Sequence, residues 1–211
     1  MQIEVGRELL AQWAALAGRD AEQVGVDLVR RYSESHRRYH TVDQLAAMLA
    51  VIDDLAAEAD DPDAVRFAAF FHDAIYAVDR ADNEERSAEL AEASLESLGI
   101  PTEIAREVGR LVRLTTSHDP NPDDRNGSVL CDADLAVLAD DEQAYAAYTA
   151  AVRAEYHHVP DELFRLGRAA VLQGLAQQPH LFRTPTARAR YEAPARANLA
   201  AELATLATET S

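Results

Sequence analysis

The stretch FAAFFHDAIYAV, residues 67–78, indicates a buried helix that carries two ionisable side chains in its apolar surface. Ten of its twelve residues are apolar or aromatic, and the other two, His72 and Asp73, are adjacent. An ionised carboxylate in such surroundings is costly unless a positive group meets it, and no Lys or Arg lies within a helical turn of Asp73. The two residues are therefore either a buried pair satisfied by a distant arginine or by the backbone, or part of a metal site.

The sequence on both sides of this stretch has helical periodicity and no sustained alternation of apolar and polar residues. No repeat or domain-sized linker interrupts it, and residues 117–127 are the most loop-like segment. We therefore expect one all-α domain, residues 1–211, of nine to ten helices. Helices are expected over about 4–17, from 20, from 41, over 62–78 and 82–99, from 101, and over 129–139, 141–157, 160–177 and 186–207, the last bent or interrupted at Pro194.

Composition limits the classes of partner. The formal net charge of −17 repels a polyanion and no basic stripe offsets it, so long nucleic acid is not expected, while a small phosphorylated molecule is. No apolar run is long enough to span a bilayer and the first residues do not resemble a signal peptide. Cys131 is the single cysteine and cannot form an internal disulfide framework, so a cytoplasmic location is expected.

A second carboxylate lies on an apolar stripe. Asp134 has Leu130 four residues before it and Leu138 four residues after it, so its side chain is expected to point inward. Asp132 is about 200° away around the helix and is expected to be exposed or to support the site indirectly. Two carboxylates and a histidine from different helices converge best on a divalent metal ion, and these donors suit Mn, Fe, Co, Ni, Zn or Mg.

An ordered set of phrases resembles the HD-domain superfamily of metal-dependent phosphohydrolases, in a bacterial subfamily of about this length. The resemblance covers about residues 30–203 and implies an all-α fold and hydrolysis of phosphate esters, often of nucleotides. It implies that His72, Asp73 and Asp134 are metal ligands. The phrases are HRRYHTVDQL, FFHDAIY, DNEERSAEL, LTTSH, CDADLAVL, EYHHVPDELFRLGR and RARYEAPARANL.

The fourth ligand position departs from the family pattern. Relatives typically read Tyr-His-Asn/Thr-x-x-His, whose second histidine is a usual ligand, whereas this chain reads YHTVDQ over 39–44 and has Gln44 there. Gln44 either closes the helix start in a capping box with Thr41 or is a weak amide donor to the metal. His40 either supplies the missing ligand or acts as a general acid that protonates the leaving oxygen.

Further residues are candidates for contacts with substrate. His118 matches a family position that often binds a second metal or contacts phosphate. Alternatively, it is a histidine at a helix C-terminus, where the helix dipole favours it. Arg37 and Arg38 are expected to clamp a phosphate, and Glu84 to orient the attacking water.

The expected function is hydrolysis of a small phosphate ester, such as a nucleotide, with catalytic roles for His40, Asp73 and His118. Asp73 is expected to bridge the metal and the attacking water, and His40 or His118 to assist the leaving group. The alternative is a non-catalytic ligand-binding or interaction module of the same fold, which Gln44 favours. The stripe of Tyr145, Tyr148, Val152 and Tyr156 packs either in the core or against a partner in a homodimer.

Overall fold

The computed structural model describes residues 2–208, which form ten α-helices and three short 3-10 helices, with no strand in that range. This confirms the prediction of an all-α fold of nine to ten helices. The α-helices are α1 (Gln2–Ala17), α2 (Glu22–Tyr32), α3 (Val42–Leu55), α4 (Pro62–Phe71), α5 (Asn83–Ser97), α6 (Thr102–Leu114), α7 (Arg125–Leu135), α8 (Glu142–Glu155), α9 (Asp161–Gln177) and α10 (Pro185–Thr208). The 3-10 helices are η1 (Arg19–Ala21), η2 (Ala56–Glu58) and η3 (Ala136–Ala139).

Local sequence signals set several helix ends. Gly18 follows α1 with a φ of 87°, a left-handed conformation that favours glycine. Asp61 caps α4, because its carboxylate accepts the backbone N–H of Ala64 at 3.0 Å, and Pro62 occupies the first turn, where its missing N–H costs nothing.

The helix of the opening stretch is shorter than predicted, since α4 ends at Phe71 and not at Val78. The backbone beyond it bonds to other side chains instead of continuing the helix. Arg37 donates to the carbonyls of Asp73 and Ala74 at 2.8 and 3.4 Å, and the N–H of Ile75 donates to the hydroxyl of Ser87. The expected interruption at Pro194 is also absent, because α10 runs through that residue.

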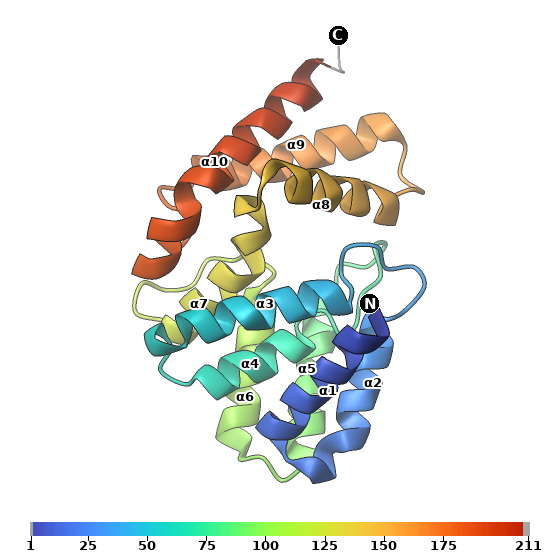
Figure 1. Cartoon of the computed structure of the whole chain (residues 1–211), viewed down its shortest axis with the longest axis vertical. Coiled ribbons are helices and arrows are strands. Elements are labelled where there is room, and N and C mark those ends of the chain that lie inside the picture. Colours follow the sequence, from blue (N-terminus) through green and yellow to red (C-terminus); the bar gives the residue numbers. More distant parts are fainter. Residues whose placement is uncertain (1, 209–211) are drawn as a thin grey trace.

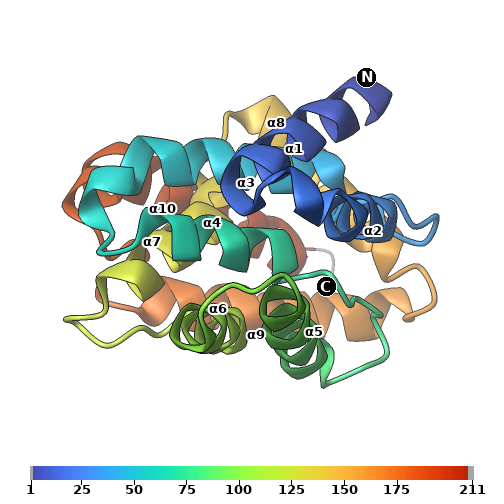
Figure 2. The ribbon, with the colours of Figure 1, turned by 90° about the horizontal axis from the view of Figure 1, so that it is seen from below.

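Helix α4 lies at the centre of the lower body, which explains why its sequence is so apolar. It packs against α3, α5, α6 and α7, and α1 packs against α2 and α3 (Figure 1). Seen from below, α5 and α6 are viewed end-on and cross the direction of α4 steeply (Figure 2). Helices α8, α9 and α10 form the upper layer of Figure 1, and α10 contacts both α9 and η3.

One continuous apolar core receives side chains from every α-helix. Trp13 anchors its lower half, with its ring edge-on to those of Phe67, Phe70 and Phe71. The indole N–H donates to the carbonyl of Ala21 at 2.8 Å, so this large buried ring leaves no polar atom unsatisfied. These contacts fix α4, and with it His72, against α1.

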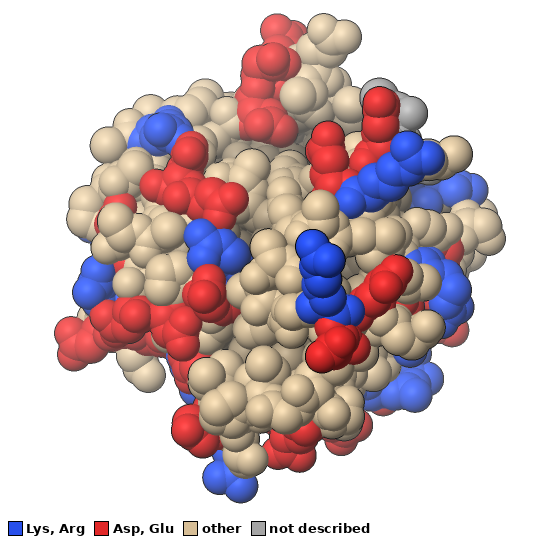
Figure 3. Space-filling view, turned by 60° about the horizontal axis from the view of Figure 1, so that its bottom comes forward, with Lys and Arg blue, Asp and Glu red and all other residues tan. Residues whose placement is uncertain are grey.

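On the face shown in Figure 3, acidic and arginine side chains are interspersed, and no continuous basic stripe crosses it. Within residues 2–208, no helix has both the length and the apolar character that crossing a membrane requires.

Candidate functional site

The site begins where α4 ends. His72 is the C-cap residue of α4 and is 2% exposed, and Asp73 follows it at the edge of a polar pocket. The ring Nδ1 of His72 lies 2.7 Å from the carbonyl oxygen of Ala69, and an N–H at Nδ1 donates to that oxygen. This contact directs Nε2 of His72 toward two carboxylates, which is how a ligating histidine is held in metal sites.

The sequence-predicted residues His72, Asp73 and Asp134 meet at this point. Nε2 of His72 lies 3.1 Å from Oδ2 of Asp73 and 3.8 Å from Oδ1 of Asp134. Asp134 comes from α7, sixty-one positions after Asp73 (134 − 73 = 61), so tertiary packing brings the two carboxylates together.

The electrostatics of the three groups are coupled. Burial disfavours the imidazolium form of His72, but the carboxylates of Asp73 and Asp134 together outweigh burial and raise the pKa of His72 to about 9. Burial opposes ionisation of Asp73 as well, and the charge of His72 nevertheless lowers the pKa of that carboxyl. Without a metal, a proton on His72 therefore supplies the positive charge that a bound cation would supply. Binding a cation would release this proton.

His118 is the fourth predicted residue at this point. Its Nε2 lies 2.7 Å from Oδ2 of Asp134, so the ring fixes the second carboxylate. His118 has a φ of 51°, an uncommon backbone conformation for a non-glycine residue. Non-glycine residues in this backbone conformation are concentrated at functional sites. His118 fits this tendency, because it contacts the candidate ligand Asp134.

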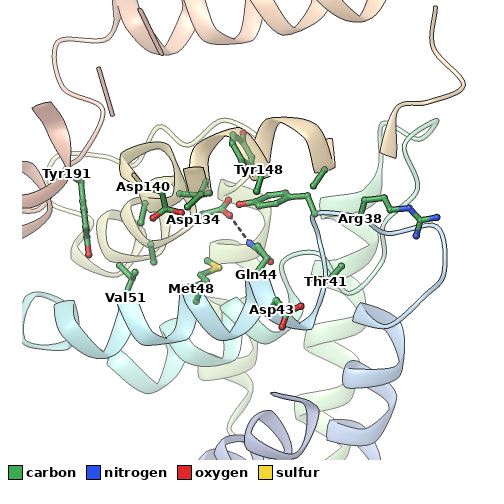
Figure 4. A pocket seen from close by; sticks show the side chains of 18 residues that line it. Arg38, Thr41, Asp43, Gln44, Met48, Val51, Asp134, Asp140, Tyr148 and Tyr191 are labelled. Atoms are coloured by element: carbon green, nitrogen blue, oxygen red, sulfur yellow. Dashed lines mark hydrogen bonds between the residues drawn. The ribbon is translucent and has the colours of Figure 1, made fainter. Parts of the chain in front are cut away.

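Gln44 projects into the same space and does not form the capping box that was one of its two predicted roles. Thr41 is the N-cap residue of α3, but no side-chain hydrogen bond caps the helix. The amide Nε2 of Gln44 instead lies 3.4 Å from both Nε2 of His72 and Oδ1 of Asp134, while its Oε1 is buried without a partner. Figure 4 shows Gln44 on α3 and Asp134 on α7 pointing toward each other.

Among residues 2–208, no three His, Cys, Asp or Glu side chains stand in an arrangement ready to hold a metal ion. The donor chemistry nevertheless suits a divalent cation, because one imidazole nitrogen and two carboxylates converge. A half-turn of the Gln44 amide would bring its unpartnered Oε1 toward this point as a fourth, neutral donor. The types of side chain present therefore suit a cation. In the orientation observed, however, the amide of Gln44 presents its N–H groups to the site.

His40 lines the same pocket, and it is held by a carboxylate that sequence reasoning missed. Nδ1 of His40 donates to Oε2 of Glu155 at 2.7 Å, and Nε2 lies 3.9 Å from Oδ2 of Asp73. The other oxygen of Glu155 accepts the backbone N–H groups of Arg38, Tyr39 and His40 at 2.8, 2.9 and 3.0 Å. This fully buried side chain thus fixes both the segment and the ring.

Burial lowers the pKa of His40, but the carboxylates of Asp73 and Glu155 outweigh it and the net pKa is raised. Burial alone would raise the pKa of Glu155, yet its hydrogen bond from His40 lowers it to about 2. A signal for Glu155 does exist in the sequence, since it shares an apolar stripe with Tyr148, Val152 and Val159. Glu155 therefore shows the same sequence pattern as Asp134, a carboxylate among apolar neighbours three and four residues away.

Arg37 has a structural environment that does not suit the predicted contact with phosphate. Its side chain is fully buried, and its five N–H donors meet five acceptor contacts, on Glu34 and on the carbonyls of His40, Asp73 and Ala74. Arg37 therefore shapes the segment around the site and has no donor left for a phosphate.

The remaining predicted residues lie at the margins. Arg38 is exposed and points away from Asp134 (Figure 4), whereas Glu84 lines the same pocket of about 260 Å³ as His72 and His118. The expectation that Asp132 is exposed is wrong. Asp132 is completely buried and accepts the backbone N–H groups of Arg183 and Thr184, because its side chain faces the start of α10.

Comparison of the chain with protein-family models, with curated proteins and with solved structures finds no match.

Proposed function

We propose that this chain is a divalent-metal-dependent phosphohydrolase of the HD-domain superfamily that acts on a small phosphate ester. One observation carries the proposal: Nε2 of His72 lies 3.1 Å from the carboxylate of its neighbour Asp73 and 3.8 Å from the carboxylate of Asp134, which a different helix supplies. Two histidines, His40 and His118, flank that point in a polar pocket. Clusters of buried ionisable groups in a cleft are typical of functional sites.

His72, Asp73 and Asp134 would hold the cation, with the amide oxygen of Gln44 as the fourth donor. When bound, the cation would polarise the phosphoryl oxygen and favour ionisation of the attacking water. The chain needs this charge, because its net charge of −17 and the carboxylates of the site repel a phosphate dianion.

His40 is the residue we assign as general acid. Its Nδ1 is tied to Glu155, so Nε2 is the atom that faces the site, and its raised pKa favours the protonated ring. In the hydrolysis, the water oxygen bonds to phosphorus as the bond from phosphorus to the leaving oxygen breaks. His40 gives its proton to the leaving oxygen, and the proton lost by the water restores His40, so the products are the alcohol and hydrogen phosphate.

Glu155 is a positioning residue in this scheme, since it acts through His40. His118 holds Asp134 in place through the contact between its Nε2 and Oδ2. Glu84 remains the candidate for orienting the water, because it lines the site pocket.

The test is a screen of phosphomonoesters and nucleotides with Mn, Co, Ni or Mg, on protein purified without chelator. The proposal predicts metal-stimulated hydrolysis that Asp134→Asn abolishes. Asp140→Asn is the matched control, because Asp140 is an exposed carboxylate outside the site pocket and its loss should leave the activity in place. No metal-stimulated hydrolysis of any ester, or equal activity in both variants, would contradict the proposal.

Gln44 favours a second candidate function, a non-catalytic module of the same fold. In the arrangement observed, its amide N–H donates to Oδ1 of Asp134 at 3.4 Å, so the amide occupies the side of that carboxylate that would face a metal. This candidate predicts that the wild-type chain binds no cation and hydrolyses no ester, while still binding a small molecule in its pockets.

A further inference from the structure

An apolar cleft adjoins the candidate site. It lies between α8 and α9 and has a volume of about 460 Å³, larger than the site pocket. Apolar side chains line it from α8, from the connecting segment and from α9: Val152, Val159, Leu163, Phe164 and Val171. Apolar side chains that line a concave surface are typical of small-molecule binding sites.

The side of the cleft that α9 provides is unusually exposed for such apolar residues. Leu163 and Val171 are 60% and 57% exposed, and Leu172 is the one residue of α9 that is buried. The cleft's basic side chain, Arg168, already donates to Glu202 and to the hydroxyl of Tyr148. The cleft therefore offers apolar contact and little charge.

Two side chains, those of His40 and Tyr156, line both the cleft and the site pocket. The leaving oxygen of a substrate must lie at His40 if His40 protonates it. The organic group attached to that oxygen then extends past His40, and on that side the cleft is the space that receives it.

A second groove, of about 370 Å³, also adjoins the site and shares the side chains of Tyr39 and Tyr148 with the cleft (Figure 4). Its lining includes Gln44 and Asp134 together with two further carboxylates, Asp43 and Asp140, and one basic side chain, that of Arg38. Of the described residues that line it, none is His40. A phosphate ester placed there would meet carboxylates and would hold its leaving oxygen away from the proton donor.

We propose that the cleft between α8 and α9 binds the organic group of the substrate, and that the substrate is a phosphate monoester of an apolar alcohol or phenol. This assignment rests on the proposed function. Unlike a nucleotide, such a substrate has an organic group that needs shape and apolar contact more than hydrogen bonds.

Gly167 provides the test variant. It lies within α9 and lines the cleft, and a Cβ atom added there would meet nothing within 4 Å. Gly167→Phe therefore fills the cleft without a clash at the backbone. Gly174→Phe is the matched control, because Gly174 lies two helical turns further along α9, is equally open, and lines neither the cleft nor the site pocket among the described residues.

Two readouts are needed. The first is a fluorescence titration of the metal-free protein with naphthol, which reports on the cleft without phosphate, metal or activity. The second is kcat/KM for naphthyl phosphate divided by kcat/KM for glycerol phosphate, which reports on the organic group alone. We expect Gly167→Phe to weaken naphthol binding and to lower this ratio by about tenfold or more, while Gly174→Phe changes neither.

Several results would overturn the inference while leaving the phosphohydrolase in place. One is that Gly167→Phe leaves naphthol binding or the kcat/KM ratio unchanged. Another is that the ratio falls in Ala47→Phe instead, because Ala47 lines the groove of Figure 4. A dimer in sedimentation that Gly167→Phe dissociates would place a second copy of the chain in the cleft and would also overturn it. If naphthol binds at the cleft but no ester is hydrolysed, the proposed function is contradicted. The assignment of the cleft to the organic group of a substrate is then contradicted as well.

Discussion

Gln44 determines how the candidate site can meet a cation. Its amide lies 3.4 Å from both His72 and Asp134, and an imidazole at this position would offer a stronger nitrogen donor than a neutral amide oxygen. We expect Gln44→His to tighten binding of Mn or Co by about 10–100-fold, as measured by calorimetric titration.

Asp43→His is the control for that substitution. Asp43 is exposed, so the variant adds an imidazole beside the site without directing it inward, and its metal affinity should match that of the wild type. An unchanged affinity in Gln44→His would contradict the role given to Gln44 and would indicate that His40 is the fourth ligand.

Glu155 is expected to act on catalysis through the pKa of His40. Glu155→Gln preserves the shape and one acceptor oxygen but removes the charge that raises this pKa. The acid form of His40 is then lost at lower pH, so the basic limb of the kcat/KM profile should move to lower pH. We also expect kcat to fall by about 10–100-fold with the metal content unchanged. A lower kcat with an unmoved profile would show that Glu155 has only a structural role.

Single residues also show what a local pattern can predict. Asp134 was found because its neighbours four residues away are apolar, which is information carried by one helix. The neutralisation of Glu155 by His40, 115 positions away, is a tertiary contact that no local window contains. The same limit explains the errors at Arg37 and Asp132, whose partners include backbone groups of distant segments.

At the scale of elements, helix type and order followed from periodicity, while several boundaries depended on tertiary contacts. The end of α1 at Gly18 and the start of α4 at Asp61 were predictable, because each signal lies in the residue itself. The end of α4 was not, because the hydrogen bonds that stop it come from Arg37 and Ser87.

The contact between α1 and α2 leads to a stability prediction at Gly25. A Cβ atom at Gly25 would lie 2.4 Å from Cδ1 of Trp13, whose ring is held between α4 and the backbone of Ala21. We expect Gly25→Ala to lower the free energy of unfolding by about 1–3 kcal/mol in a denaturant titration, despite the better helix propensity of alanine. Gly174→Ala, in open space, should raise it by about 0.4–1 kcal/mol, and equal effects in the two variants would refute the packing argument.

The upper layer depends on an ion pair between α9 and α10. Arg168 donates to both oxygens of Glu202 at 2.7 and 3.0 Å, and the side chains are 10% and 13% exposed. We expect Glu202→Ala to cost about 2 kcal/mol of unfolding free energy, because it leaves a partly buried guanidinium unpaired. Asp54→Ala removes the partner of Arg190 in a pair that is more than half exposed, and should cost less than about 0.5 kcal/mol by the same denaturant titration.

Over the whole molecule, strong negative charge coexists with a candidate site that is itself acidic. The chain carries 37 Asp and Glu against 20 Lys and Arg, and three carboxylates, those of Asp73, Asp134 and Glu155, lie within or beside the site. Composition predicted the sign of this field, but the positions of the carboxylates required the fold. A bound cation is the feature that would reconcile such a site with a phosphorylated substrate.

The most direct measurement is the metal content of the chain, purified without chelator and compared with that of Asp134→Asn by elemental analysis. The account predicts that the wild type retains a divalent transition metal or Mg and that Asp134→Asn loses it, with Asp140→Asn behaving as the wild type. A wild-type chain without bound metal, which also takes up none when Mn, Co, Ni or Mg is added, would contradict the account.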